Sequence, residues 1–144
     1  MKDFENILIE NGWKKHIENS ENSSLIFEDI EKMIGFKLPD DYSEYVQNFY
    51  GGENFIGNEY IILWDLNDLV EYNQDYEIIQ NLKNIIGIGG NGGGEFIGIE
   101  YLKDSEYRIV LCPLIGMNEK DFMEIGSSFS DFLMRLQLGK NWFK

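Results

Sequence analysis

The sequence predicts an α+β domain in which N-terminal, central and C-terminal helices flank an antiparallel sheet of about five to six strands. Apolar residues recur at helical spacing toward both ends of the chain, whereas the middle shows the short alternating segments of successive strands. The length agrees, because 144 residues of which 43% are hydrophobic correspond to one domain of the usual size, roughly 100–150 residues. Residues 1–144 are therefore expected to form a single domain.

Two helices are expected before residue 36. The first stops near Gly12, and a polar linker over residues 18–23 separates it from the second. Ser24 is the predicted N-cap of the second helix, and Gly35 ends that helix at the C′ position. The apolar residues of the two helices are Phe4, Ile7, Leu8, Phe27, Ile30 and Ile34.

A third helix is expected to open at Leu38-Pro39, because proline suits a first helical turn. Asp40 and Asp41 follow and favour the positive end of the helix dipole. Gly51-Gly52 is expected to end this helix. Its apolar face is Tyr42, Tyr45, Val46, Phe49 and Tyr50.

The spacing of apolar residues then changes to that of strands, and one closing helix follows them. Asp65 is expected to cap a short helix, with Asp68 in the capping-box position. Ser127 and Ser128 cap the closing helix, and Gly139 stops it. Strands are predicted over residues 60–64, 84–88, 95–102, 106–112 and 122–125.

The helical and alternating stripes must bury one another, so they are expected to share one core. The predicted core joins helix residues to strand residues: Phe27, Ile30, Ile34, Tyr45, Val46, Phe49, Phe129, Phe132 and Leu133 with Ile97, Ile99, Ile109 and Leu111.

The charge balance bears on the kind of partner. The chain has 26 acidic residues against 12 basic ones and a formal net charge of −14. Its arginines, Arg108 and Arg135, belong to no basic cluster, so nucleic-acid binding is not expected. An acidic surface suits a cationic partner, although the same charge also serves solubility.

The sequence also bears on location. Its apolar runs are far shorter than the ~20 residues that span a bilayer. The first residues, 1–6, lack the cationic start of a signal peptide, and a single cysteine, Cys112, allows no internal disulfide. We therefore expect a cytoplasmic protein with no membrane partner.

Residues 87–92 match the dinucleotide-binding pattern G-x-G-x-x-G, yet they lack its context. A dinucleotide site needs a helix directly after the glycines to receive the pyrophosphate. Here the predicted strand over residues 95–102 follows instead. The glycines are expected to form a flexible hairpin loop over residues 87–94 that binds no nucleotide.

No catalytic constellation emerges from the sequence. His16 is the only histidine, and Cys112 lies in an apolar strand without a basic neighbour to lower its pKa. Residues 65–77 carry several acids but lack the glycine and terminal glutamate of a calcium loop. A carboxylate pair for glycoside hydrolysis stays open as an alternative. We expect a protein without enzymatic activity, cofactor or metal.

At residues 30–42, IEKMIGFKLPDDY, the sequence resembles the SUKH superfamily, which includes fungal cell-wall-synthesis regulators and many bacterial toxin-immunity proteins. The resemblance continues through Phe49-Tyr50-Gly51-Gly52, Trp64-Asp65-Leu66, the glycine turn at 92–94 and the closing S-F-x-x-F-L pattern within 126–133. The collinear order of these motifs carries the resemblance, which covers residues 24–138, while residues 1–23 match only loosely.

The resemblance implies an α+β domain without enzymatic activity. In bacteria it implies a small cytoplasmic immunity protein that binds and neutralises a cognate toxin domain, often a nuclease. The alternative is a regulatory or scaffolding protein related to the fungal cell-wall (glucan) synthesis regulators. The superfamily shares no catalytic residues or metal ligands, and its toxin-contact surfaces differ between members, so the resemblance itself names no contact residue.

Two acidic stretches are the candidate partner-binding residues, because a basic protein docks favourably on an acidic surface. They are Asp40, Asp41 and Glu44 on the third helix, and Asp65, Asp68, Glu71, Asp75 and Glu77 on and after the next short helix. Capping and solubility are the alternative roles of these charges. Exposed tyrosines and tryptophans are expected to contribute anchors, and a monomer is the expected state.

Overall fold

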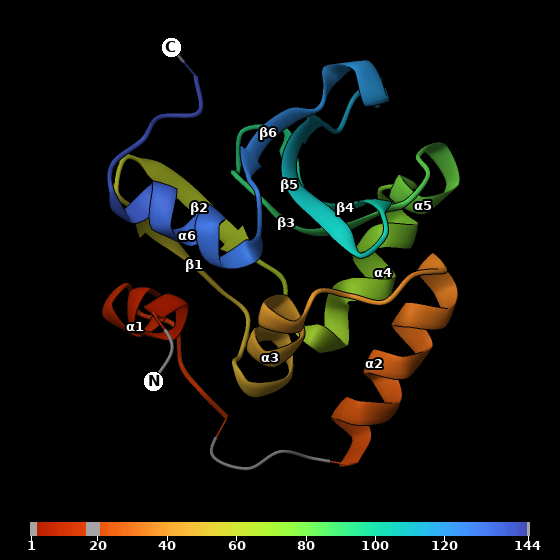
Figure 1. The fold of residues 1–144 in the computed structure, drawn as a ribbon, viewed down its shortest axis with the longest axis horizontal. Coiled ribbons are helices and arrows are strands. Elements are labelled where there is room, and N and C mark those ends of the chain that lie inside the picture. The colour runs from red at the N-terminus through yellow and green to blue at the C-terminus, as the bar shows by residue number, and fades with distance from the viewer. Residues whose placement is uncertain (1–2, 17–20, 144) are drawn as a thin grey trace.

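The structure, a computed structural model, describes residues 3–16 and 21–143. Its centre is one antiparallel sheet of six strands in the order β1-β2-β3-β4-β5-β6, which curls around the helices α1, α3 and α6 (Figure 1). The strands are β1 (Gly52–Ile56), β2 (Glu59–Leu63), β3 (Ile85–Gly90), β4 (Glu95–Lys103), β5 (Glu106–Pro113) and β6 (Met123–Gly126). The predicted α+β class and its antiparallel sheet are confirmed.

The helices lie on both faces of the sheet. Their bounds are α1 (Asp3–Glu10), α2 (Glu21–Ile34), α3 (Asp40–Asn48), α4 (Leu69–Asp75), α5 (Ile78–Asn81) and α6 (Phe129–Gln137), and short 3-10 turns span Leu66–Asp68 and Glu119–Asp121. Neighbouring strand residues point to opposite faces, so Ile86 and Ile97 join the larger core whereas Ile85 and Phe96 join a smaller one with Ile78 of α5. Two cores therefore form, one on each face.

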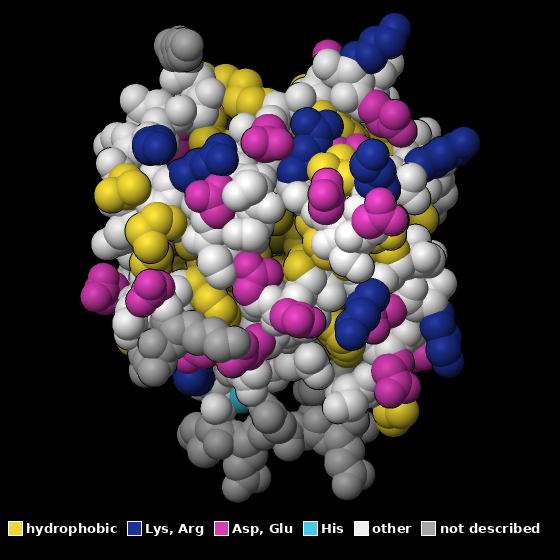
Figure 2. Space-filling view, viewed as in Figure 1, with side chains coloured by type: hydrophobic (Ala, Val, Ile, Leu, Met, Phe, Trp, Pro, Cys, Tyr) yellow, Lys and Arg dark blue, Asp and Glu magenta, His cyan; other side chains and the backbone are white. Residues whose placement is uncertain are grey.

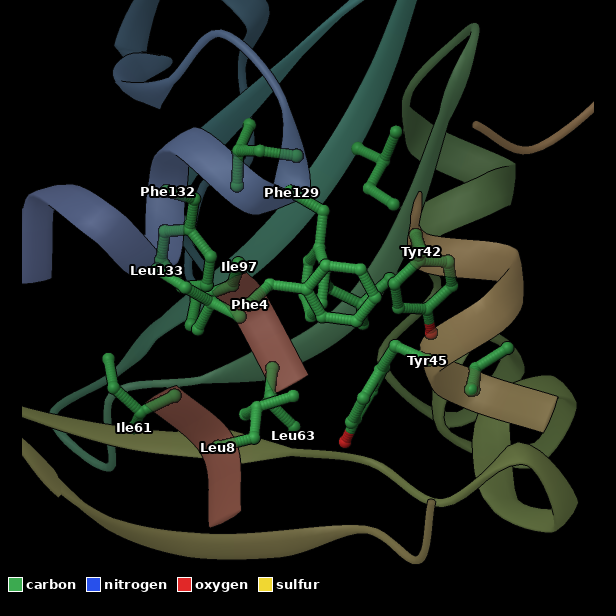
Figure 3. Close-up of a cluster of buried hydrophobic side chains, with 14 of the residues drawn as sticks. Phe4, Leu8, Tyr42, Tyr45, Ile61, Leu63, Ile97, Phe129, Phe132 and Leu133 are labelled. Atoms are coloured by element: carbon green, nitrogen blue, oxygen red, sulfur yellow. The ribbon is translucent and has the colours of Figure 1, made fainter. Parts of the chain in front are cut away.

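Side chains from distant segments meet in the larger core (Figure 3). Phe129 of α6 lies at its centre, with ring centroids 6.1 Å from Phe4, 5.3 Å from Tyr42 and 5.0 Å from Tyr45. All predicted core residues belong to this cluster or pack against it, with Phe27 and Ile34 only partly buried. The predicted core is confirmed.

The sequence did not indicate β1. We assigned Gly51-Gly52 to the end of a helix, whereas Gly52 begins a strand at the edge of the sheet. The middle of β1 is exposed, so the apolar alternation that marks a strand is weak there. The sequence did contain one signal for this hairpin, the pair Gly57-Asn58, because a Gly-Asn pair between strands favours a two-residue turn. In the structure Gly57 adopts a φ of +62°.

The N-terminal boundary of α2 also differs from the prediction. The helix begins at Glu21, so Ser24 lies inside it and is not its N-cap, and residues 21–23 of the predicted linker are helical. Serine and asparagine cost only about 0.5 kcal/mol each inside a helix, which allows the helix to extend. Residues 18–20 of that linker lie outside the described part of the chain.

α3 is shorter than predicted at both ends. Pro39 is its N-cap, in an extended conformation, and does not form the first turn. The helix ends at Asn48, because Phe49 is extended and forms an antiparallel bridge with Lys15. The predicted placement of Tyr50 on the buried helical face is therefore wrong, and its side chain is 52% exposed.

The glycine-rich segment is mostly strand. We predicted a flexible loop over residues 87–94, but residues 87–90 belong to β3, and only residues 91–94 form the hairpin loop. At Gly89 an added Cβ would lie 1.9 Å from the carbonyl oxygen of Ile62 on β2. The glycines of β3 therefore permit close approach of strands, and the loop supplies the positive φ values at Gly92 and Gly94.

The buried tyrosines predict an alkaline unfolding transition. Tyr42 and Tyr45 are at most 1% exposed, and burial, together with the nearby Asp65 carboxylate, raises the pKa of both phenols. Unfolded phenols ionise near pH 10, so stability from this source is present below about pH 10 and falls above it. Absorbance at 295 nm and circular dichroism, followed together, are expected to show these two of the eight tyrosines ionising only as the chain unfolds.

The matched variant for this measurement is Tyr42→Phe, which keeps the ring and removes one phenol. Its loss of stability with pH above 10 is expected to be shallower than that of the unaltered chain. Ionisation of all eight tyrosines with an unchanged dichroism spectrum would contradict the assignment.

Candidate functional site

One buried side chain holds α4 against β3. The Nδ2 of Asn73 donates to the carbonyls of Leu69, at 2.8 Å, and Gly87, at 2.9 Å, while its Oδ1 accepts from the Gly87 N–H at 2.7 Å. Gly87 permits this contact because an added Cβ would lie 2.6 Å from Cδ1 of Ile78 and 3.2 Å from Oδ1 of Asn73. The helix is therefore fixed in place on the outer face of the sheet.

Three aromatic side chains, Trp64, Tyr72 and Tyr76, lie nearly parallel beside this contact, and we call them the ring stack. The Trp64 centroid lies 4.6 Å from that of Tyr72 and 6.0 Å from that of Tyr76, with interplanar angles of 22° and 15°. The two tyrosine rings are 6.2 Å apart at 13°. Trp64 is half-buried, whereas Tyr72 and Tyr76 are 37% and 43% exposed. The ring stack thus presents two aligned tyrosine rings to solvent.

Acidic residues precede and follow Tyr72 along α4 and its N-cap. Residues three or four apart on a helix are neighbours, with Cβ atoms about 5–6 Å apart, so Asp68 and Asp75 flank Tyr72. Glu71 lies three residues after Asp68 and four residues before Asp75. All three acids are exposed, and the ion pairs between described residues use none of them. Together with Tyr72 and Tyr76 they form what we call the acid–aromatic surface.

Two of the predicted contact residues have internal roles. The Oδ2 of Asp41 accepts hydrogen bonds from the N–H and Oγ of Ser130, at 2.8 and 2.9 Å, and so joins α3 to the start of α6. Asp65 is the N-cap of the 3-10 turn before α4, as predicted, and its Oδ1 accepts from the Gly51 N–H at 2.9 Å. Both carboxylates connect elements of the fold. Asp68 is instead the N-cap of α4 and makes no side-chain capping hydrogen bond there, so its predicted capping-box role is wrong.

The other predicted acids lie apart from the acid–aromatic surface or at its end. Glu77 is exposed between α4 and α5 with φ +58°. Asp40 is exposed in the first turn of α3, and Glu44 is half-buried on the same helix. The structure therefore places Asp68 at the N-cap of α4 and Glu71 and Asp75 on α4 itself, whereas the α3 acids lie on another helix.

A cavity of about 270 Å³ adjoins the ring stack. Its lining combines aromatic, aliphatic and glycine residues: Ile62, Trp64, Tyr76, Gly89, Gly90, Gly92, Gly94, Glu95, Phe96 and Leu114. The cavity makes the surface beside Tyr76 concave. Aromatic rings next to a concavity are typical of the anchor positions of protein interfaces.

We did not single out the ring stack, Asn73 or the cavity from the sequence. Tyr72 and Tyr76 did carry a signal, since their spacing of four residues places them on one side of a helix. Trp64 follows a strand, and its contact with them depends on the tertiary packing of α4. The cavity depends on glycines that we had assigned to a loop.

The surface of the protein carries charges of both signs. On the face drawn in Figure 2, acidic side chains are interspersed with lysines and arginines. A hollow of about 550 Å³ at the end of α2 is likewise lined by Glu28 and Glu31 together with Lys32 and Lys37.

The described residues offer few groups for chemistry. Across residues 3–16 and 21–143 no three histidine, cysteine or acidic side chains are grouped to hold a metal ion. Cys112 is buried and free, and burial raises the pKa of its thiol, which disfavours the reactive thiolate. In the same ranges, no helix has the length and hydropathy needed to cross a membrane.

Comparison with known protein families gives one result that bears on this site. A family model described as SMI1 / KNR4 family (SUKH-1) matches residues 23–135, which is most of the chain. The matched range agrees with the expected extent of the resemblance, residues 24–138, and includes the whole acid–aromatic surface. No curated protein matches the chain.

Proposed function

Because the chain belongs to the SMI1 / KNR4 family (SUKH-1), we propose that it is an immunity protein that binds and neutralises a cognate bacterial toxin domain. Family membership supports an immunity or regulator-like role. The acid–aromatic surface carries the more specific proposal. It combines exposed tyrosine rings with acids that form no ion pair with another described residue, and it lies along a helix that Asn73 holds against β3. In this proposal the protein acts without catalysis, as one cytoplasmic monomeric domain over residues 1–144.

The chemistry of the partner follows from charge. A toxin that cleaves nucleic acid needs a basic surface to hold its substrate. A protein with a net charge of −14 attracts such a surface at long range and can cover it. Asp68, Glu71 and Asp75 are the proposed contacts, with Tyr72 and Tyr76 as anchors. Asp40, Glu44 and Glu77 are proposed as weaker, peripheral contacts.

The second candidate is a regulatory or scaffolding protein related to the cell-wall synthesis regulators. The family match supports it equally, and it would use the same surface with a different cellular partner. Co-purification from the native host separates the candidates, because the first requires a toxin domain in the complex and the second a cellular protein.

The charge of α4 gives the direct test of the proposal. Reversal of two acids, Asp68→Lys with Glu71→Lys, is expected to slow association with the purified toxin domain by about tenfold or more, because steering by opposite charge is lost. The salt dependence of the association rate is expected to weaken. Both side chains are exposed, so the melting temperature is expected to change little. Stopped-flow kinetics at two salt concentrations measures the effect.

The matched control reverses two exposed acids elsewhere, Glu119→Lys with Asp121→Lys, on the 3-10 turn before β6. It changes the net charge equally but leaves α4 intact. Equal slowing by both pairs would show that only the total charge matters, and unchanged kinetics for the α4 pair would remove the acid–aromatic surface as the docking site.

A further inference from the structure

We propose that the ring stack receives an arginine side chain of the basic partner. The guanidinium lies flat on the exposed faces of Tyr72 and Tyr76, and its N–H groups pair with Asp68 or Asp75. This inference rests on the proposed function and names the side chain that the acid–aromatic surface recognises.

The geometry of the rings carries the first step. A cation is attracted to an aromatic face when it lies within about 6 Å of the ring centroid. The tyrosine centroids are 6.2 Å apart and their planes differ by 13°, so one planar group can contact both rings. The Trp64 centroid lies 4.6 Å from that of Tyr72 and 6.0 Å from that of Tyr76, and these contacts restrain the two tyrosine rings before a partner arrives. Preorganisation of this kind lowers the entropic cost of binding.

The charges favour arginine over lysine. A guanidinium is planar, weakly hydrated and able to donate two parallel hydrogen bonds to one carboxylate, whereas an ammonium acts as a hydrated point charge. Asp68 and Asp75 stand on either side of Tyr72 along the helix, so a group stacked on that ring has a carboxylate on two sides. Lysine would gain the charge attraction but not the stacking.

No cation from the described chain occupies this place. The cation–ring contacts between described residues join Lys15 to Phe49 and Arg108 to Phe122, and neither involves the ring stack. The adjoining cavity of about 270 Å³ has a mixed lining, in which Glu95 lies together with the apolar residues Ile62, Phe96 and Leu114. An aliphatic residue next to the arginine can therefore be buried at the same time.

Two short peptides test the proposal on the full chain. The probe is acetyl-Leu-Arg-Gly-Arg-Leu-amide, and its partner peptide has lysine in place of both arginines, so length and charge are equal. Nuclear magnetic resonance titration is expected to shift the indole signal of Trp64 and the amide signals of α4. The lysine peptide is expected to bind about twofold to fivefold more weakly.

Variants assign the preference to the rings. Tyr72→Leu with Tyr76→Leu is expected to abolish the difference between the peptides, whereas Tyr72→Phe with Tyr76→Phe is expected to keep it, because stacking needs the ring and not the hydroxyl. Tyr50→Leu is the control, since Tyr50 is also exposed but contacts His16. Circular dichroism checks that each variant is folded.

Equal binding of the two peptides, or shifts confined to other elements, would overturn the arginine assignment. Shifts of the Trp64 indole by a β-glucan oligosaccharide instead of the peptides would also overturn it, because exposed aromatic rings can stack on sugars. These outcomes differ from failure of the proposed function. If the α4 charge reversal slows toxin association while the peptides bind equally, the docking surface stands and only the arginine assignment fails.

Discussion

Phe132→Ala is expected to lower the free energy of unfolding by about 3–5 kcal/mol, the usual cost of removing a buried phenylalanine side chain. Phe132 is 0% exposed. Its ring lies 6.1 Å from Phe129 and 6.4 Å from Trp142, measured between centroids. The substitution leaves a cavity between α6 and the sheet that the close-packed surroundings fill only in part. Urea denaturation followed by circular dichroism measures the loss.

The matched control is Phe143→Ala, the same substitution at a side chain that is 51% exposed. Its effect is expected to stay within about 1 kcal/mol, as for surface positions generally. A loss below 1 kcal/mol for Phe132→Ala would show that this side chain does not contribute to the core.

Asn73→Ala is the second substitution with a large expected effect, about 2–4 kcal/mol of destabilisation. It leaves the buried N–H of Gly87 without its acceptor and the Gly87 carbonyl without the Asn73 donor, and each unsatisfied group costs about 1–3 kcal/mol. The variant is also expected to weaken toxin binding, because α4 and the ring stack lose their attachment to β3. Urea denaturation and the stopped-flow assay measure the two effects.

Asn81→Ala is the natural comparison. The Nδ2 of Asn81 donates to the carbonyl of Glu77, four residues earlier, at 2.8 Å, as Nδ2 of Asn73 does to Leu69. Asn81 is exposed and its bond is local, so its replacement removes the helical bond without touching the sheet. Similar losses from both substitutions would show that the bonds to Gly87 contribute nothing.

The fold was predictable from the sequence wherever burial imposes a periodic pattern. Both ends of the chain bury helix faces against the sheet, and the stripes of α1 and α6 report this directly. β1 was not predicted, because an edge strand with an exposed middle has no periodic pattern of apolar residues. The strand conformation of residues 87–90 was not predicted, because glycine is compatible with a loop and also with the close approach of two strands. Only the position of β2 decides between these two structures.

The candidate site was predictable in part. Helical spacing placed Asp68 and Glu71 together, since that spacing is a local property. The internal role of Asp41 depends on Ser130, which lies 89 positions away in the sequence. The internal role of Asp65 depends on Gly51. The alignment of Trp64 with the tyrosines likewise follows from the tertiary position of α4, which a pattern in one segment does not contain.

The central position of Phe129 has a consequence for synthesis on the ribosome. α1 and α3 leave the exit tunnel before the strands, but Phe129, the side chain that their rings surround, is made only after β6. Until α6 emerges, the apolar faces of Phe4, Tyr42 and Tyr45 lack this partner, and domains fold as cooperative units. This domain is therefore expected to stay open to proteases and chaperones on the ribosome until α6 is released.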